Sequence, residues 1–113
     1  MNKTLKLSTP IDINGKKVCE VPYDIEGMTV KDKLNAGKAM KVAGIPMSGM
    51  EEMDPDYHIY LFAAAISKAD PSIDITDVLR LNAKDAQKGC SEVRNFFYLD
   101  SEVLSQTTTS EEQ

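Results

Sequence analysis

The pair Asn14-Gly15 is the feature that most tightly constrains the fold of this chain. It lies within "IDINGKKV", between two stretches whose residues favour β-strands. Asn-Gly is the preferred centre of a two-residue β-hairpin, because both residues adopt the positive φ of a type I′ turn at little cost. We therefore predict an antiparallel hairpin over residues 4–22. The turn sets the facing pairs: Ile13 with Lys16, Asp12 with Lys17, and Ile11 with Val18.

The two strands differ in how their apolar residues alternate. Those of the first strand all have odd numbers and share one face: Leu5, Leu7, Ile11 and Ile13. On the second strand Val18 lies on that face, whereas Cys19 and Val21 alternate away from it, which indicates a bulge or a second buried side. Pro10 lacks the N–H that a ladder requires and marks an edge position or a bulge. A hairpin alone is marginally stable, so helices must cover it.

Four helical segments are predicted after the hairpin, at residues 29–43, 55–69, 76–81 and 83–98. Each begins at a residue that caps helix N-termini: Thr29 with Asp32, Asp54 before Pro55, Thr76, and Asn82 with Asp85. The second segment is apolar on more than one side, so we expect it to be central. The buried faces expected for the first and last segments are Val30, Leu34, Gly37 and Met40, and Ala86, Cys90, Val93 and Phe97.

These elements predict an α+β fold in which an N-terminal β-hairpin packs on a small bundle of three to four helices. The expected organisation is one domain over residues 1–100, followed by a flexible polar tail at 101–113. Its lysines and arginines are scattered and its formal net charge is −5, which argues against nucleic-acid and anionic membrane partners. No apolar run is long enough to span a bilayer, and the first ten residues do not resemble a signal peptide. We expect a cytoplasmic protein with two reduced cysteines.

The sequence shows no catalytic signature. The single histidine, His58, follows Asp54 and Asp56, a spacing that in principle suits a divalent metal, but Asp54 already serves as a helix cap. There is no phosphate-binding loop, dinucleotide-binding glycine run or nucleophile elbow. We therefore expect no catalytic residues, no metal and no cofactor, and no enzymatic activity.

The candidate functional residues are apolar. Met47, Met50 and Met53 recur at every third position between two prolines. Either they fill an irregular gap in the core, or they form an adaptable contact surface, a common use of methionine. Phe96, Phe97 and Tyr98 are consecutive on a helix and cannot all face one core. We expect Phe97 to be buried and Phe96 or Tyr98 to contact a client or a second copy of the chain.

Taken together, the segments "LKLSTPIDINGKKVCEV", "MTVKDKLNAGKA", "YHIYLFAAAISKA", "ITDVLRLNAKDAQK" and "VRNFF" occur in an order that resembles a known family. Over about Leu5 to Leu99, the chain is similar to the tail assembly chaperones of tailed bacteriophages, the group first described in contractile-tailed phages. The resemblance implies a non-catalytic protein that binds and solubilises the tape measure protein during tail morphogenesis. It also implies action in the cytoplasm of the bacterial host and absence from the mature virion.

Further partners are implied by the same resemblance: the tail tube protein, and a longer form of the chain made by a ribosomal frameshift. We expect homo-oligomers as well. The alternative is a structural virion protein, such as a connector or tail-terminator subunit. An acidic mimic that occupies a DNA-binding site is a weaker alternative, because Lys residues are interleaved with Asp and Glu in the helices.

Overall fold

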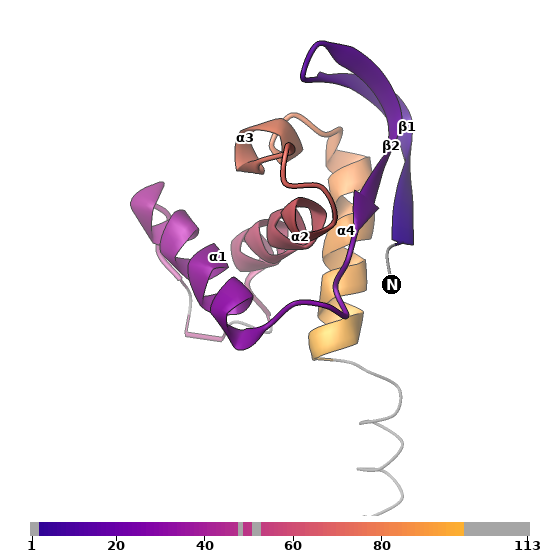
Figure 1. The fold of residues 1–113 in the computed structure, drawn as a ribbon. Helices are drawn as coiled ribbons and strands as arrows, with labels where there is room; N and C mark the ends of the chain where they lie inside the picture. Colours follow the sequence, from indigo (N-terminus) through magenta and orange to yellow (C-terminus); the bar gives the residue numbers. More distant parts are fainter. Residues whose placement is uncertain (1–2, 48, 51–52, 99–113) are drawn as a thin grey trace, which may run out of the picture.

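The computed structural model describes residues 3–47, 49–50 and 53–98. A β-hairpin of β1 (Lys3–Ile13) and β2 (Lys16–Tyr23) is followed by α1 (Val30–Val42), α2 (Pro55–Ala69), α3 (Ile75–Val78) and α4 (Ala83–Phe97) (Figure 1). The predicted α+β arrangement, an N-terminal hairpin with helices behind it, is confirmed. The tail predicted at 101–113 lies outside the described residues.

The hairpin turns at Asn14 and Gly15, whose φ angles are 53° and 80°. The three facing pairs predicted next to the turn are all present. Further along, Lys6 pairs with Glu20 whereas Ile11 pairs with Val18, so residues 7–10 of β1 lie opposite Cys19 alone. The extra residues therefore belong to β1, around Pro10, and they explain why the alternation of β2 changes phase.

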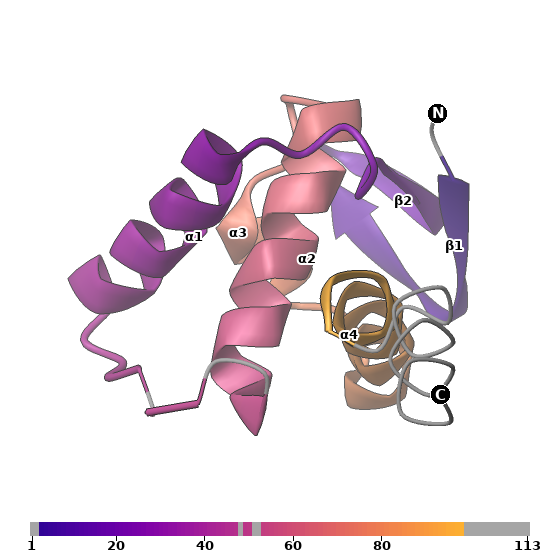
Figure 2. The same cartoon turned by 90° about the horizontal axis from the view of Figure 1, so that it is seen from below.

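Helix α2 is central, as predicted. Figure 2 shows α1 on one side of α2, with α4 and the hairpin on the other. Eight of its fifteen residues are buried, among them Leu61, Phe62 and Ile66. The ring of Phe62 packs against Tyr23 of β2, with 5.3 Å between ring centroids, and covers the α4 backbone at Gly89. One aromatic side chain thus joins the hairpin, α2 and α4.

Three of the predicted N-caps are confirmed and one is wrong. Thr29 and Asp32 form a capping box on α1, Asp54 caps α2, and Asn82 caps α4. The short helix α3 is capped by Asp74 rather than Thr76, and it covers Ile75–Val78 rather than residues 76–81. The Asp74 carboxylate accepts hydrogen bonds from two backbone N–H groups of α3, and Asp77 accepts one from the backbone of Asp74. This reciprocal pair places the cap of α3 two residues before the predicted one.

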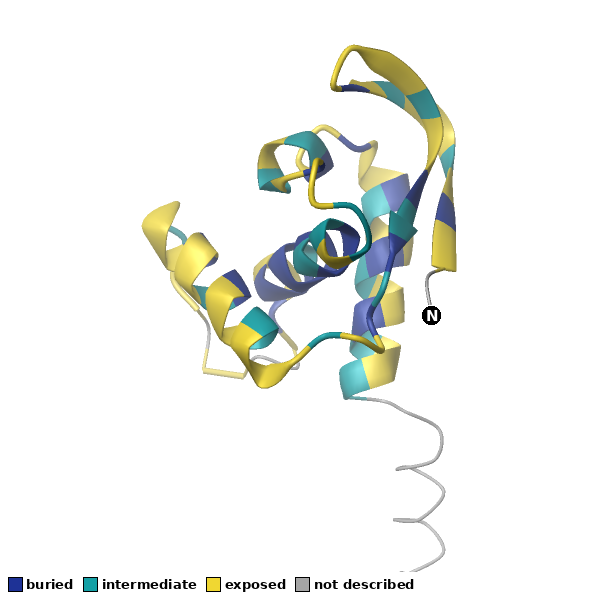
Figure 3. Cartoon of the chain, viewed as in Figure 1, coloured by how far each residue is buried: buried dark blue, intermediate teal, exposed yellow. Residues whose placement is uncertain are grey.

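The buried face predicted for α1 is partly wrong. Met40 is buried and Gly37 is half-buried, but Val30 and Leu34 are exposed and Ala36 takes their place in the core. Figure 3 shows α1 buried only where it faces α2. Small residues at 36 and 37 let the two helices approach closely, and this contact turns Val30 and Leu34 outward. On α4, Val93 is buried, and Ala86 and Phe97 pack against the core as expected.

Candidate protein-binding surface

Exposed apolar side chains are concentrated on α1 and on the segment that joins it to α2. Of the eight large hydrophobic residues that are exposed in the described part of the chain, six lie between positions 30 and 53. Their exposed fractions are Val30 73%, Leu34 60%, Val42 88%, Met47 42%, Met50 64% and Met53 58%. We call these six residues the α1–connector surface. The other two are Leu79, directly after α3, and Phe96 on α4.

The three methionines do not fill the core. A Cβ at Gly37 of α1 would lie 4.0 Å from the methyl carbon of Met47 and 3.8 Å from the ring of Tyr57. Met47 therefore lies close to α1 and remains 42% exposed. The sulfur of Met53 accepts a hydrogen bond from the Arg94 guanidinium of α4 at 3.8 Å. Of the two interpretations of this segment, the exposed placement favours the contact surface. A role in binding stays a prediction.

The two aromatic candidates near the end of α4 point to different places. Phe96 is 39% exposed and lines a small hollow with Tyr23 and Ile25. Tyr98 is half-buried, its ring centroid 5.7 Å from that of His58 on α2 and 5.6 Å from the Lys33 ammonium of α1. Tyr98 therefore belongs with α1 and α2, whereas Phe96 faces the end of β2. The five candidate residues do not form one site.

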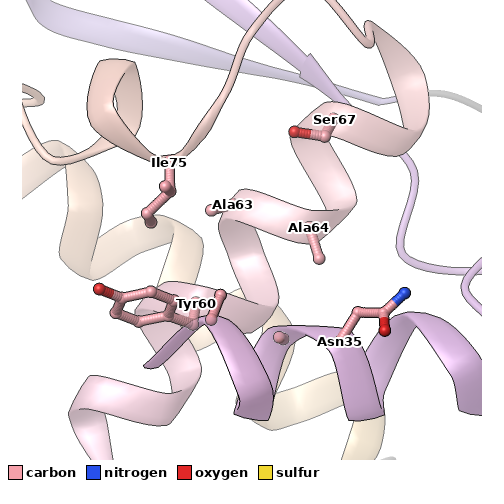
Figure 4. Close-up of a pocket in the computed structure, with 8 residues that line it drawn as sticks. Asn35, Tyr60, Ala63, Ala64, Ser67 and Ile75 are labelled. Carbon is pink, nitrogen blue, oxygen red and sulfur yellow. The ribbon is translucent and has the colours of Figure 1, made fainter. Parts of the chain in front are cut away.

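A hollow on the other flank of α1 was not predicted from the sequence. It lies between α1, α2 and α3, and its volume is about 220 Å³ (Figure 4). Its lining is Asn35, Ala36, Ala39, Tyr60, Ala63, Ala64, Ser67 and Ile75. The sequence contains one signal for this hollow: small residues recur in both helical segments, at Ala36 and Ala39 and at Ala63 and Ala64. These small side chains leave a hollow between α1, α2 and α3, which the larger side chains of Tyr60 and Ile75 border.

The charges of α1 are distributed unevenly. Lys31, Lys38 and Lys41 are exposed on its outer side. Its single acidic residue, Asp32, is engaged elsewhere: it accepts a hydrogen bond from the Thr29 backbone and lies 3.0 Å from the Lys68 ammonium of α2. The Thr29 hydrogen bond, followed by the Lys68 contact, holds the pKa of Asp32 below its usual value. The outer side of this helix is therefore basic in a chain whose net charge is −5.

The chain's candidate reactive side chains are Cys90 and His58. Burial raises the pKa of the Cys90 thiol to about 11, so it is protonated at neutral pH and a weak nucleophile. His58 of α2 is buried beside the ring of Tyr98, and Asp54, one turn before it, is the cap of α2. Within residues 3–47, 49–50 and 53–98, no three His, Cys, Asp or Glu side chains are grouped closely enough to hold a metal ion.

In the part that the structure describes, no helix combines the length and the apolar content that a membrane crossing requires. The chain matches no protein-family model, no curated protein and no solved structure.

Proposed function

We propose that this protein is a tail assembly chaperone that binds the tape measure protein during phage tail morphogenesis, without catalysis. The observation that carries the proposal is the α1–connector surface, six exposed apolar side chains within 24 consecutive positions. Exposed apolar side chains that cluster on a small protein mark contact sites, and three of these six lie on one helix. The order of sequence segments, which resembles that family over nearly the whole chain, supplies the identity of the client.

The physical requirements of the task fit this surface. A tape measure protein is a long helical chain, and its apolar stripes aggregate unless they are covered. Helix-in-groove contacts need an apolar ridge or groove of helical length, and α1 with the adjacent hollow supplies both. Methionine side chains adapt to different partner surfaces. Many copies on one client act at high effective concentration, so each contact is allowed to be weak.

In this proposal the net negative charge of the chain keeps the coated client soluble. Copies that coat one client bring their net charges of −5 together, and like charges keep the coated complexes apart. Self-association of the chain and contact with the tail tube protein belong to the same proposal.

Co-expression with the tape measure protein tests the proposal. The wild-type chain is expected to keep this client out of inclusion bodies, and the variant M47S/M50S/M53S is expected to lose that effect. The matched control is Leu79→Ser, which removes an exposed apolar side chain at the C-terminal end of α3. Far-UV circular dichroism and thermal melting establish that both variants are folded. Equal rescue by the wild type and the triple variant would exclude the methionines as contacts.

Composition of purified particles separates the proposal from its main alternative. A chaperone is absent from mature virions, whereas a connector or tail-terminator subunit is present in fixed copy number. Quantitative mass spectrometry of particles therefore decides between them. Detection of the chain at several copies per particle would overturn the chaperone proposal.

A further inference from the structure

We propose that the outer face of α1 binds an amphipathic helix whose apolar residues are flanked by carboxylates. By the outer face we mean Val30, Lys31, Leu34, Lys38, Lys41 and Val42. The inference rests on the proposed function, because it names the chemistry of the client segment. The contacts and charges of α1 support it independently, and they can be tested with the isolated protein.

The apolar part of this face is a ridge. Val30, Leu34 and Val42 are exposed by 73%, 60% and 88%, and with Lys38 they occupy every fourth position of α1. Side chains at intervals of four form the ridge that enters the groove of a second helix in the commonest mode of helix packing. Helix α1 packs on α2 with its opposite side, through Ala36 and Met40. The ridge is therefore a second packing face that nothing in the described chain covers.

The charges on the ridge specify the partner. Lys31, Lys38 and Lys41 are all exposed, and within the described residues no carboxylate forms an ion pair with them. The fourth lysine of α1, Lys33, lies on the inner side, over the rings of Phe97 and Tyr98. A partner helix with Glu or Asp beside its apolar stripe places opposite charges next to these three ammonium groups. A partner with a basic flank meets repulsion instead.

Anionic lipid is the competing occupant of a basic apolar helix face. Two observations favour a helix. The apolar residues of the ridge are all aliphatic and of modest size, without the Trp or Phe that anchor interfacial helices. The rest of the chain carries the charge that gives a net −5, and an anionic membrane repels it.

Two synthetic helices test the inference. They share the same leucine positions over about 20 residues, a length at which helix formation is practical, and differ only in flanking Glu or flanking Lys. Binding to the full chain is measured by fluorescence anisotropy at about 0.02 M and about 0.5 M salt. The acidic helix is expected to bind about tenfold more tightly at low salt, since three exposed ion pairs together supply about that factor. High salt should reduce this preference.

Variants of the chain show whether the preference for the acidic helix depends on the lysines of α1. K31E/K38E/K41E is expected to reverse the preference in favour of the basic helix, and K31Q/K38Q/K41Q to abolish it. The matched control is K3E/K16E/K84E, which changes the net charge equally at exposed lysines outside α1 and should keep the preference. Leu34→Ser should weaken the binding of both synthetic helices alike, because it removes an apolar side chain from the ridge without changing its charge.

Three other outcomes would overturn either the inference or the proposed function. Equal binding of the two helices, or a preference unaffected by the α1 variants, overturns the inference and leaves the chaperone proposal standing if co-expression rescue is observed. Failed rescue together with a preference that maps to α1 overturns the proposed function and retains the acidic-helix surface. Binding of phosphatidylserine vesicles that requires the α1 lysines, with no binding of either helix, assigns the face to a membrane and overturns the inference.

Discussion

The carboxylate of Asp85 on α4 accepts two hydrogen bonds from the backbone N–H of Ser8 in β1, at 2.9 and 3.0 Å. A third comes from the N–H of Thr9 at 3.3 Å. Asp85 is fully buried, and the bulge of β1 around Pro10 turns these N–H groups toward α4. The residue that the sequence indicated as part of the α4 cap is therefore a link between residues 77 positions apart.

Replacing this carboxylate should be costly at neutral pH. Asp85→Ala leaves the N–H groups of Ser8 and Thr9 without their acceptor, and we expect a loss of about 2–3 kcal/mol in the free energy of unfolding. Urea denaturation monitored by circular dichroism measures it. Asp85→Asn keeps the shape and one acceptor oxygen, and is expected to lose less. A loss below half a kcal/mol for the alanine variant would contradict the link.

The same carboxylate makes stability depend on pH. Hydrogen bonds from the Ser8 backbone hold the pKa of Asp85 below its usual value in the folded chain. Its contribution is therefore fully present above the unfolded pKa of about 3.9, and is lost as pH falls through the lower folded value. The free energy of unfolding should fall below about pH 4, and Asp85→Asn should reduce that slope. An unchanged slope in the variant would rule out this residue as the source.

Gly89 and Gly37 form a matched pair of helical glycines with opposite expected responses to alanine. A Cβ at Gly89 meets the ring of Phe62 well inside contact distance, so Gly89→Ala should destabilise the fold by about 1–3 kcal/mol. At Gly37 the nearest atoms are 3.8 and 4.0 Å away, so Gly37→Ala should stabilise it by about 0.5–1 kcal/mol through helix propensity. Thermal melting of both variants tests this. Stabilisation by both would show that Phe62 yields easily.

The orientation of α1 predicts a contrast between two of its residues. Met40 is 1% exposed, and Met40→Ala should cost about 2–5 kcal/mol because it opens a cavity against α2. Leu34 is 60% exposed, and Leu34→Ser should change the free energy of unfolding by less than about 0.5 kcal/mol. Denaturant titrations measure both. A large cost at Leu34 would restore the buried face predicted from the sequence.

The turn of the hairpin predicts a specific requirement for glycine. Gly15 has a φ of 80°, a region that costs residues with a Cβ roughly 1–2 kcal/mol. Gly15→Ala should destabilise the chain by about that amount, whereas Gly15→Asn should cost less because Asn tolerates this region better. Comparison of the two melting temperatures checks the order. Equal effects would indicate that the strain is relieved by a change of turn type.

The sequence alone determined the elements whose signals are local. The Asn14-Gly15 turn, the register beside it and the caps at Thr29, Asp54 and Asn82 were predictable, because each depends on residues at most a few positions apart. The cap of α3 was wrong although it is local, since Asp74 and Thr76 both suit the role and only the backbone geometry selects between them.

The tertiary structure decided the features that depend on residues distant in the chain. Which side of α1 is buried follows from its close approach to α2, and that contact exposes Val30 and Leu34 as the candidate binding ridge. Asp85 meets Ser8, and Phe62 meets Gly89, only because the fold brings them together. Periodicity shows that a helix has an apolar side, but packing selects which apolar residues enter the core, and those left outside form the surface available to a partner.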